Sequence, residues 1–273
     1  MNKIHVNDII KLRKKTGFGI MECKKSLIVM EGNFEKAIEF LRKTNKNKNY
    51  VRHENNASQG ALISKVNSNN KKGIIIGINC ETDFVAKNEF FLKLANEIAE
   101  TALNFDDKNN ILLSSIKNIK IKEILFDYQS IIGEKLTFNI FDKLKSDFVV
   151  PYTHHGNKIA ALVGLSLALP GVNRIGKELA MQIVAMNPIA LNKEEIPSNI
   201  LEKEKEIIKD QECRNGKSED LVEKIVQGKL KKFICDNTLL FQKYIKNQKI
   251  TVQNYLKQFN NKISITEYKR IAL

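Results

Sequence analysis

The chain has 273 residues, 42% of them hydrophobic and 28% charged, a balance typical of a folded protein with room for two or more compact units. It contains no apolar run long enough to span a bilayer and no N-terminal segment of signal-peptide type, so we expect a cytoplasmic protein. The formal net charge of +14 is spread along the whole chain, which favours an acidic partner surface over a dedicated nucleic-acid stripe.

The first 41 residues predict a small bundle of three amphipathic helices with a core of its own. The first helix begins near Val6 with Ile9, Ile10 and Arg13, and the glycine-containing turn 16–19 ends it. The second carries Ile20, Cys23, Leu27 and Met30 on one face and stops at Gly32, and Asn33 caps the third. Residues 42–58 are polar and without periodicity, so we interpret them as a linker.

Residues 59–144 predict a first α+β lobe with an antiparallel sheet. Two strand-like runs, 60–66 and 73–80, flank a polar turn and form a hairpin signal. The rest of the lobe is expected to contain helices at residues 89–103 and around 115–129, followed by an alternating strand at 134–140.

The connection between the second strand and the following helix, residues 79–88, is the most informative stretch of the chain. It places Asp83, Phe84 and Val85 in succession at a strand-to-helix turn, where a rigid tip can present them outward. The alternative is that Phe84 and Val85 begin the core face of the helix, with Thr82 and Asp83 as its N-cap.

A second lobe, residues 145–196 with 235–273, repeats the order of hairpin and helix and indicates an internal structural repeat. Strands are expected at 148–153 and 158–168 around the turn His154-His155-Gly156-Asn157, and a helix at 176–186. Strand-like alternation returns at 249–252 and 263–266, around a helical segment at 254–259.

Residues 197–234 predict a projecting antiparallel helical hairpin. Its two amphipathic helices, 198–213 and 218–233, each offer one apolar stripe, and the turn 214–217 links them. The competing interpretation is a basic helix that binds tRNA or a membrane. Six acidic residues argue against it: Glu202, Glu204, Glu206, Glu219, Asp220 and Glu223.

Three motifs of the sequence are family-specific. CETDFVAK at 80–87 resembles the signature segment of the bacterial elongation factor Ts family, the nucleotide exchange factors of elongation factor Tu. TGFGIMECKKSL at 16–27 is similar to the second-helix motif of its ubiquitin-associated-like N-terminal domain, and VEKIVQGKLKKF at 222–233 to the second helix of its coiled-coil arm. The resemblance weakens beyond residue 233. Residues 238–245 read TLLFQKYI in place of a QPF-type segment, and no extra C-terminal helix precedes Leu273.

The resemblance implies a two-lobed core with the bundle and hairpin attached, and it implies roles for eight residues. Four consecutive residues of the turn are implied to dislocate Mg²⁺ from the partner, with the aromatic ring as the wedge: Thr82, Asp83, Phe84 and Val85. Four others are implied to bind the partner GTPase: Arg13, Ile20, Met21 and His155. Two alternatives stay open, that Met21 is a core residue and that the adjacent His154 makes the contact.

The motifs of bond-making chemistry are missing from the sequence. It contains no GxxxxGK[ST] loop, no GxGxxG after a strand and no CxxC pair, and neither its four cysteines nor its four histidines indicate a metal site. We therefore expect no enzyme, cofactor, metal or nucleotide site. The resemblance implies instead an exchange factor that acts on the GDP form of elongation factor Tu in translation. The rival is a basic RNA- or ribosome-binding protein, which the absence of Trp and the six scattered Tyr disfavour. A hydrolase would need a polar cluster that the sequence does not reveal.

Overall fold

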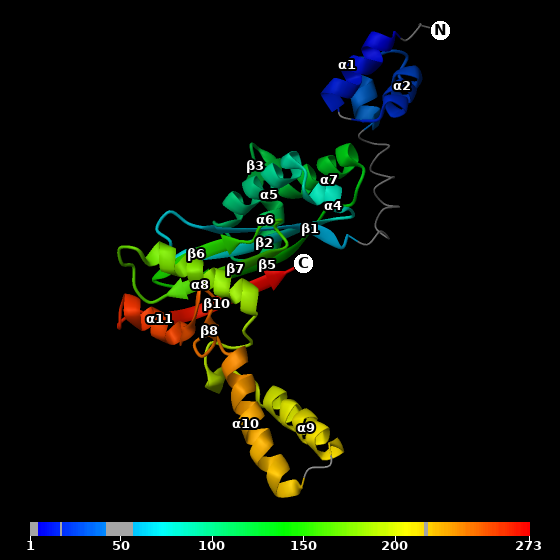
Figure 1. The fold of residues 1–273 in the computed structure, drawn as a ribbon. Coiled ribbons are helices and arrows are strands. Elements are labelled where there is room, and N and C mark those ends of the chain that lie inside the picture. The colour runs from blue at the N-terminus through cyan, green and yellow to red at the C-terminus, as the bar shows by residue number, and fades with distance from the viewer. Residues whose placement is uncertain (1–4, 17, 42–56, 216–217) are drawn as a thin grey trace. The chain divides into compact units, whose positions relative to one another are not determined.

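The computed structural model describes residues 5–16, 18–41, 57–215 and 218–273 (Figure 1). The predicted linker therefore lies outside the described residues, except for positions 57 and 58. The chain divides into two compact units, residues 1–61 with 76–141 and 273, and residues 62–75 with 142–272. No helix in the described ranges is both long and apolar enough to cross a membrane.

The N-terminal helices are α1 (Val6–Thr16), α2 (Ile20–Val29) and a third helical segment at 34–41. Their core consists of seven buried side chains: Ile9, Leu12, Phe18, Cys23, Leu27, Ala37 and Leu41. One detail of the predicted stripes is wrong. Ile20 is exposed at the start of α2, where Cys23 and Leu27 form the buried face; on α1 the buried face is formed by Ile9 and Leu12, and Ile10 is exposed.

The first sheet has the strand order β1-β2-β5, formed by β1 (Gln59–Val66), β2 (Lys72–Cys80) and β5 (Thr137–Lys145). The turn between β1 and β2 is closed by Asn67, whose carboxamide oxygen accepts hydrogen bonds from the backbone N–H groups of Lys71 and Lys72, each at 3.0 Å. The central strand is almost wholly buried, which explains its run of isoleucines.

The helix expected around 115–129 begins later than predicted, at Ile121. Residues Ser115–Ile116 (β3) and Ile119–Lys120 (β4) instead form a two-stranded hairpin between α6 (Lys108–Leu113) and α7 (Ile121–Ile132). Lys117 and Asn118 lie in the left-handed region, with φ of 51° and 66°, which is the geometry of a tight two-residue hairpin turn. A lysine at such a position gives little sequence signal.

The second sheet is antiparallel with the order β10-β7-β6, formed by β6 (Phe148–Thr153), β7 (Ile159–Leu165) and β10 (Ile265–Ala272). Helix α8 (Val172–Met186) packs its buried face into the core of this sheet. In both sheets the third strand pairs with the second strand of the hairpin, so the topology agrees with the expected internal repeat.

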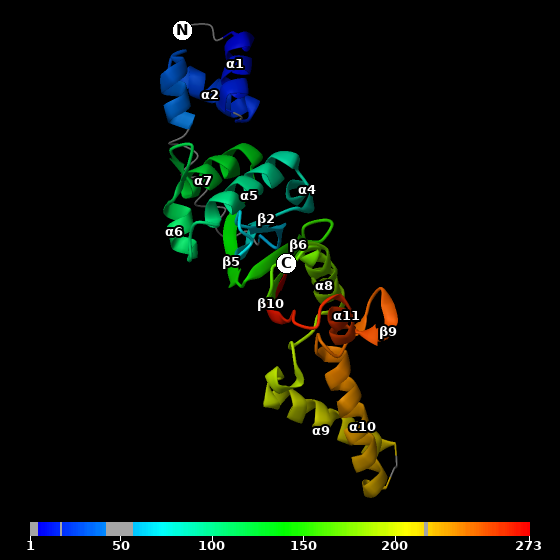
Figure 2. The same ribbon diagram turned by 90° about the vertical axis from the view of Figure 1, so that its left-hand side faces the viewer.

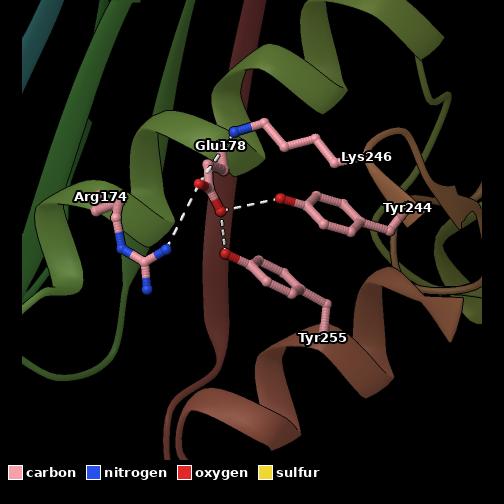
Figure 3. Close-up of polar contacts among 5 residues, drawn as sticks. All are labelled: Arg174, Glu178, Tyr244, Lys246 and Tyr255. Carbon is pink, nitrogen blue, oxygen red and sulfur yellow. Dashed lines mark hydrogen bonds and ion pairs between the residues drawn. The ribbon is translucent and has the colours of Figure 1, made fainter.

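The segment after the helical hairpin contains β8 (Lys243–Tyr244), β9 (Asn247–Thr251) and α11 (Val252–Phe259), and it is tied to α8 through Glu178 (Figure 3). The hydroxyls of Tyr244 (2.9 Å) and Tyr255 donate to one carboxylate oxygen, and Lys246 Nζ lies 3.1 Å from the other. Burial alone raises the pKa of Glu178, but the hydrogen bonds from Tyr255, Lys246 and Tyr244 outweigh it and lower the pKa.

Helices α9 (Ser198–Arg214) and α10 (Glu219–Asn237) run beside each other in both views (Figures 1 and 2). Ile208, Val222 and Val226 form their shared core, beside an ion pair of 2.6 Å between the buried Glu212 and Lys229. The two predicted helices are confirmed, with α10 extending four residues past the expected end at 233.

Candidate functional site

The stretch after β2 forms a short helix with a cap of its own. Thr82 is the N-cap of α4 (Asp83–Ala86), and its hydroxyl oxygen accepts the N–H of Val85 at 3.4 Å. The longer helix α5 (Glu89–Ala102) has a separate N-cap, Asn88. The alternative in which Thr82 caps the long helix is therefore wrong, because the chain makes two helices with two caps.

Phe84 lies on the surface of this turn, with 83% of its area exposed. The apolar face of the local structure is formed instead by Ala86 and Phe91, both buried. Phe90, at the start of α5, is also exposed, at 72%. The interpretation of Phe84 as the first core residue of the helix is thus wrong, and a large aromatic ring stands in water beside the partly buried Val85.

Asp83 occupies the first turn of α4 and forms an ion pair of 2.7 Å with Lys87, one helical turn later. Asp83 is half exposed, at 49%, and Lys87 is largely exposed, at 71%, so the ion pair contributes little to stability. The four predicted turn residues, 82–85, therefore lie together on one helical turn, with polar groups flanking an aromatic side chain.

Glu134 supports this turn and is not among the residues predicted from the sequence. Glu134, between α7 and β5, accepts hydrogen bonds from the backbone N–H groups of Glu81 (3.1 Å) and Thr82 (3.0 Å) and from the Thr82 hydroxyl (2.6 Å). In return, the Glu81 carboxylate accepts the N–H of Lys135 at 2.8 Å. The only signal available was the Gly133-Glu134 pair at a helix end, which does not reveal a partner more than fifty residues away.

The three predicted contact residues of the N-terminal helices are all on the surface. Arg13 is exposed on α1, and Ile20 and Met21 are 49% and 61% exposed at the start of α2. The alternative that Met21 is a core residue is therefore wrong. Two further apolar side chains on α2, Ile28 and Val29, are exposed and were not singled out by their sequence pattern.

His155 lies exposed in the turn between β6 and β7, next to Gly156 and Asn157, whose φ angles of 86° and 57° shape that turn. The neighbouring His154 is engaged within the chain, because its Nδ1 lies 3.1 Å from the Tyr152 hydroxyl. Residues 82–85 belong to the first compact unit and His155 to the second.

The described part of the chain holds no group of three or more His, Cys, Asp or Glu side chains that could bind a metal ion. Residues 81–87 combine an exposed aromatic ring, a solvent-accessible ion pair and a backbone held by hydrogen bonds.

A family model described as Elongation factor TS matches residues 81–273. The chain is 45% identical over its full length to the elongation factor Ts of Christiangramia forsetii, and 44% identical to that of Flavobacterium psychrophilum, covering 100% of each protein. It is also 37% identical to the elongation factor Ts of Amoebophilus asiaticus, with 99% of each chain covered.

Proposed function

This chain belongs to the elongation factor Ts family, and from that premise we propose that it is the guanine-nucleotide exchange factor of elongation factor Tu in the cytoplasm. It binds the GDP form of elongation factor Tu, dislocates Mg²⁺ and promotes the release of GDP, so that GTP can bind. The chain itself binds no nucleotide and breaks no bond.

The observation that carries the proposal is the exposed ring of Phe84 on a capped and hydrogen-bonded turn. Burial of a phenylalanine side chain in a partner cleft supplies ~2–3 kcal/mol. This is comparable with a typical allosteric coupling of ~1–3 kcal/mol. An aromatic wedge of this kind can therefore offset a substantial part of the affinity for GDP.

The mechanism follows from the coordination chemistry of magnesium. Mg²⁺ requires near-ideal octahedral geometry, so a small displacement of the partner groups around it weakens the metal and then the diphosphate. Phe84 displaces those groups, and Thr82 and Val85 frame the ring. Asp83 leaves its exposed pairing with Lys87 to compete for polar groups of the partner.

Arg13, Ile20 and Met21 add affinity through the exposed surface of α1 and α2, and His155 adds a contact from the β6–β7 turn. Because coupling is reciprocal, GDP weakens the binding of this chain by the same factor as this chain weakens the binding of GDP. Exchange therefore needs no covalent step.

The test is the release of a fluorescent GDP analogue from elongation factor Tu, followed with increasing amounts of this chain and with excess unlabelled GTP. We expect a saturable rise in the release rate. A release rate unchanged at saturating concentration would refute the proposal. A separate titration of the isolated chain with the labelled GDP should show no stoichiometric binding, and such binding would refute the absence of a nucleotide site.

A further inference from the structure

We propose that Glu134 is a positioning residue, which holds the backbone at Glu81 and Thr82 so that Phe84 is presented in one fixed orientation. The inference rests on the proposed exchange function for its consequence, but its geometry stands independently. Glu134 lies 52 residues from Thr82 in the sequence. Its hydrogen bonds go to Glu81 and Thr82, so it acts on Phe84 through the backbone.

Both oxygens of the Glu134 carboxylate are committed to the turn. Oε2 accepts the backbone N–H groups of Glu81 and Thr82 at 3.1 and 3.0 Å, and Oε1 accepts the Thr82 hydroxyl at 2.6 Å. Hydrogen bonds to an ionised acceptor are roughly twice as strong as those between neutral groups. Three of them on two consecutive residues restrict the direction in which the chain leaves β2.

The same turn is closed from two other sides. The Glu81 carboxylate accepts the N–H of Lys135 at 2.8 Å, so residues 81 and 134–135 clamp each other. The Cys80 thiol donates to the carbonyl oxygen of Thr82 at 3.2 Å. The Thr82 hydroxyl then accepts the N–H of Val85, which links the clamp to the first turn of α4.

Glu134 is itself held in place by the end of α7. Gly133 adopts the left-handed conformation, with φ of 85°, and its N–H donates to the carbonyl oxygen of Gln129. The side-chain oxygen of Gln129 accepts the N–H of Leu136 at 2.8 Å, and Leu136 is buried. The position of Phe84 therefore depends on α7 as well as on its own short helix, which alone is too short to be stable.

This arrangement predicts the effect of Glu134→Gln. A glutamine has nearly the same size, but one of its two acceptor oxygens becomes an NH₂ donor, so it cannot accept from Oγ1 of Thr82 and from both N–H groups together. The turn loses the charge that strengthened its three hydrogen bonds, and the Thr82 hydroxyl has to change from donor to acceptor to keep a bond to residue 134. The matched control is Glu123→Gln, at an exposed glutamate on α7.

The first measurement is amide hydrogen exchange of the full chain without any partner. In Glu134→Gln, peptides covering residues 81–87 should exchange about tenfold faster or more, equivalent to ~1.4 kcal/mol. Peptides of β7 and α8 should be unchanged, and Glu123→Gln should match the original chain throughout. Unaltered exchange at 81–87 in Glu134→Gln overturns the proposal, whatever elongation factor Tu does.

The second measurement is GDP release from elongation factor Tu. Glu134→Gln should lower the maximal release rate about tenfold, or ~1.4 kcal/mol, and leave the half-saturating concentration nearly unchanged. Introduced into a Phe84→Ala background, it should lower the rate by less than about twofold, because both changes act through one ring. If Glu134 had a purely structural role, Glu134→Gln would lower the release rate by the same factor with or without Phe84→Ala. That result overturns the proposal.

These arms separate the two hypotheses. If the original chain does not accelerate GDP release, the proposed function fails, and hydrogen exchange still decides whether Glu134 holds the turn. If the original chain is active and Glu134→Gln is equally active, the proposed function stands and the positioning role fails.

Discussion

At the scale of single residues, Phe84 and Phe91 show how closely spaced aromatic side chains reach opposite environments. Phe84 is 83% exposed and Phe91 is fully buried. The reason is the break between α4 and α5: Thr82 and Asn88 each start a helix, so the apolar stripe begins anew at Phe91. A single continuous helix would have placed both rings on or near one face, because seven residues complete nearly two turns.

We predict that Phe84→Ala leaves folding stability within ~0.5 kcal/mol of the original, because the ring makes little buried contact. A buried phenylalanine would instead lose ~3–5 kcal/mol. The maximal rate of GDP release should fall about 30- to 150-fold, which corresponds to the ~2–3 kcal/mol of lost ring burial. Thermal unfolding and release kinetics on one purified variant measure both quantities.

The matched control is Phe90→Ala, since Phe90 is the same residue type with 72% exposure but lies on α5. It should keep the original release rate. A large loss of folding stability in Phe84→Ala would indicate that the ring is buried in the core. Equal loss of activity in both variants would mean that α4 has no special role.

At the scale of elements, Gly176 explains how closely α8 approaches its sheet. The sequence pattern placed the start of this helix at Gly176, but α8 begins at Val172 and the glycine is buried inside it. A Cβ atom at this position would lie 2.3 Å from Cγ2 and 2.8 Å from Cβ of Val150 on β6. The absence of a side chain at Gly176 lets α8 pack closely against Val150. A rule based on helix propensity alone does not predict a glycine inside a helix.

We predict opposite effects for two glycine-to-alanine changes in helices. Gly176→Ala should destabilise the chain by ~1–3 kcal/mol, because the added methyl forces α8 away from β6. Gly228→Ala in α10 should stabilise it by ~0.5–1 kcal/mol through helix propensity, because among the described residues no atom outside the adjoining backbone of the helix lies within 4 Å of the added Cβ. Chemical denaturation of both variants compares them, and a stabilised Gly176→Ala would show that the sheet yields at this contact.

At the scale of the whole molecule, the N-terminal helices possess a core that is separate from the two sheets. Its members come only from residues 9–41. The exposed Ile20 and Met21 lie on its surface, while the turn at 82–85 lies in another part of the chain. Affinity and exchange are therefore expected to be separable by truncation.

Deletion of residues 1–55 should weaken the complex with elongation factor Tu about tenfold or more. The deletion removes Ile20 and Met21, the exposed apolar side chains that we propose are buried against the partner in the complex. The remaining chain should fold and retain a slower but measurable maximal release rate. Calorimetric titration gives the affinity, and release kinetics over a range of concentrations give the maximal rate. Normal binding by the truncated chain, or GDP release by the bundle alone, would contradict this division of labour.

The sequence by itself determined the features that depend on neighbouring residues. The hairpins at 59–80 and 148–165 and the helices α5, α9 and α10 all follow from periodicity, turn residues and caps within a few positions. These elements are made of short-range hydrogen bonds, so a local pattern is enough to predict them. The tight β3–β4 turn was not predicted, because Lys117 adopts a left-handed backbone conformation that is unusual for lysine.

Only the tertiary structure decided which side chains meet across long stretches of chain. The contact of Glu134 with Thr82 spans 52 residues, and that of Tyr255 with Glu178 spans 77. It also decided that Phe84 stands in water while Phe91 is buried. Such contacts depend on how separate elements pack, and no repeating pattern in one segment encodes a partner in another. The support that Glu134 gives to the turn at 82–85 is therefore visible only once the chain has folded.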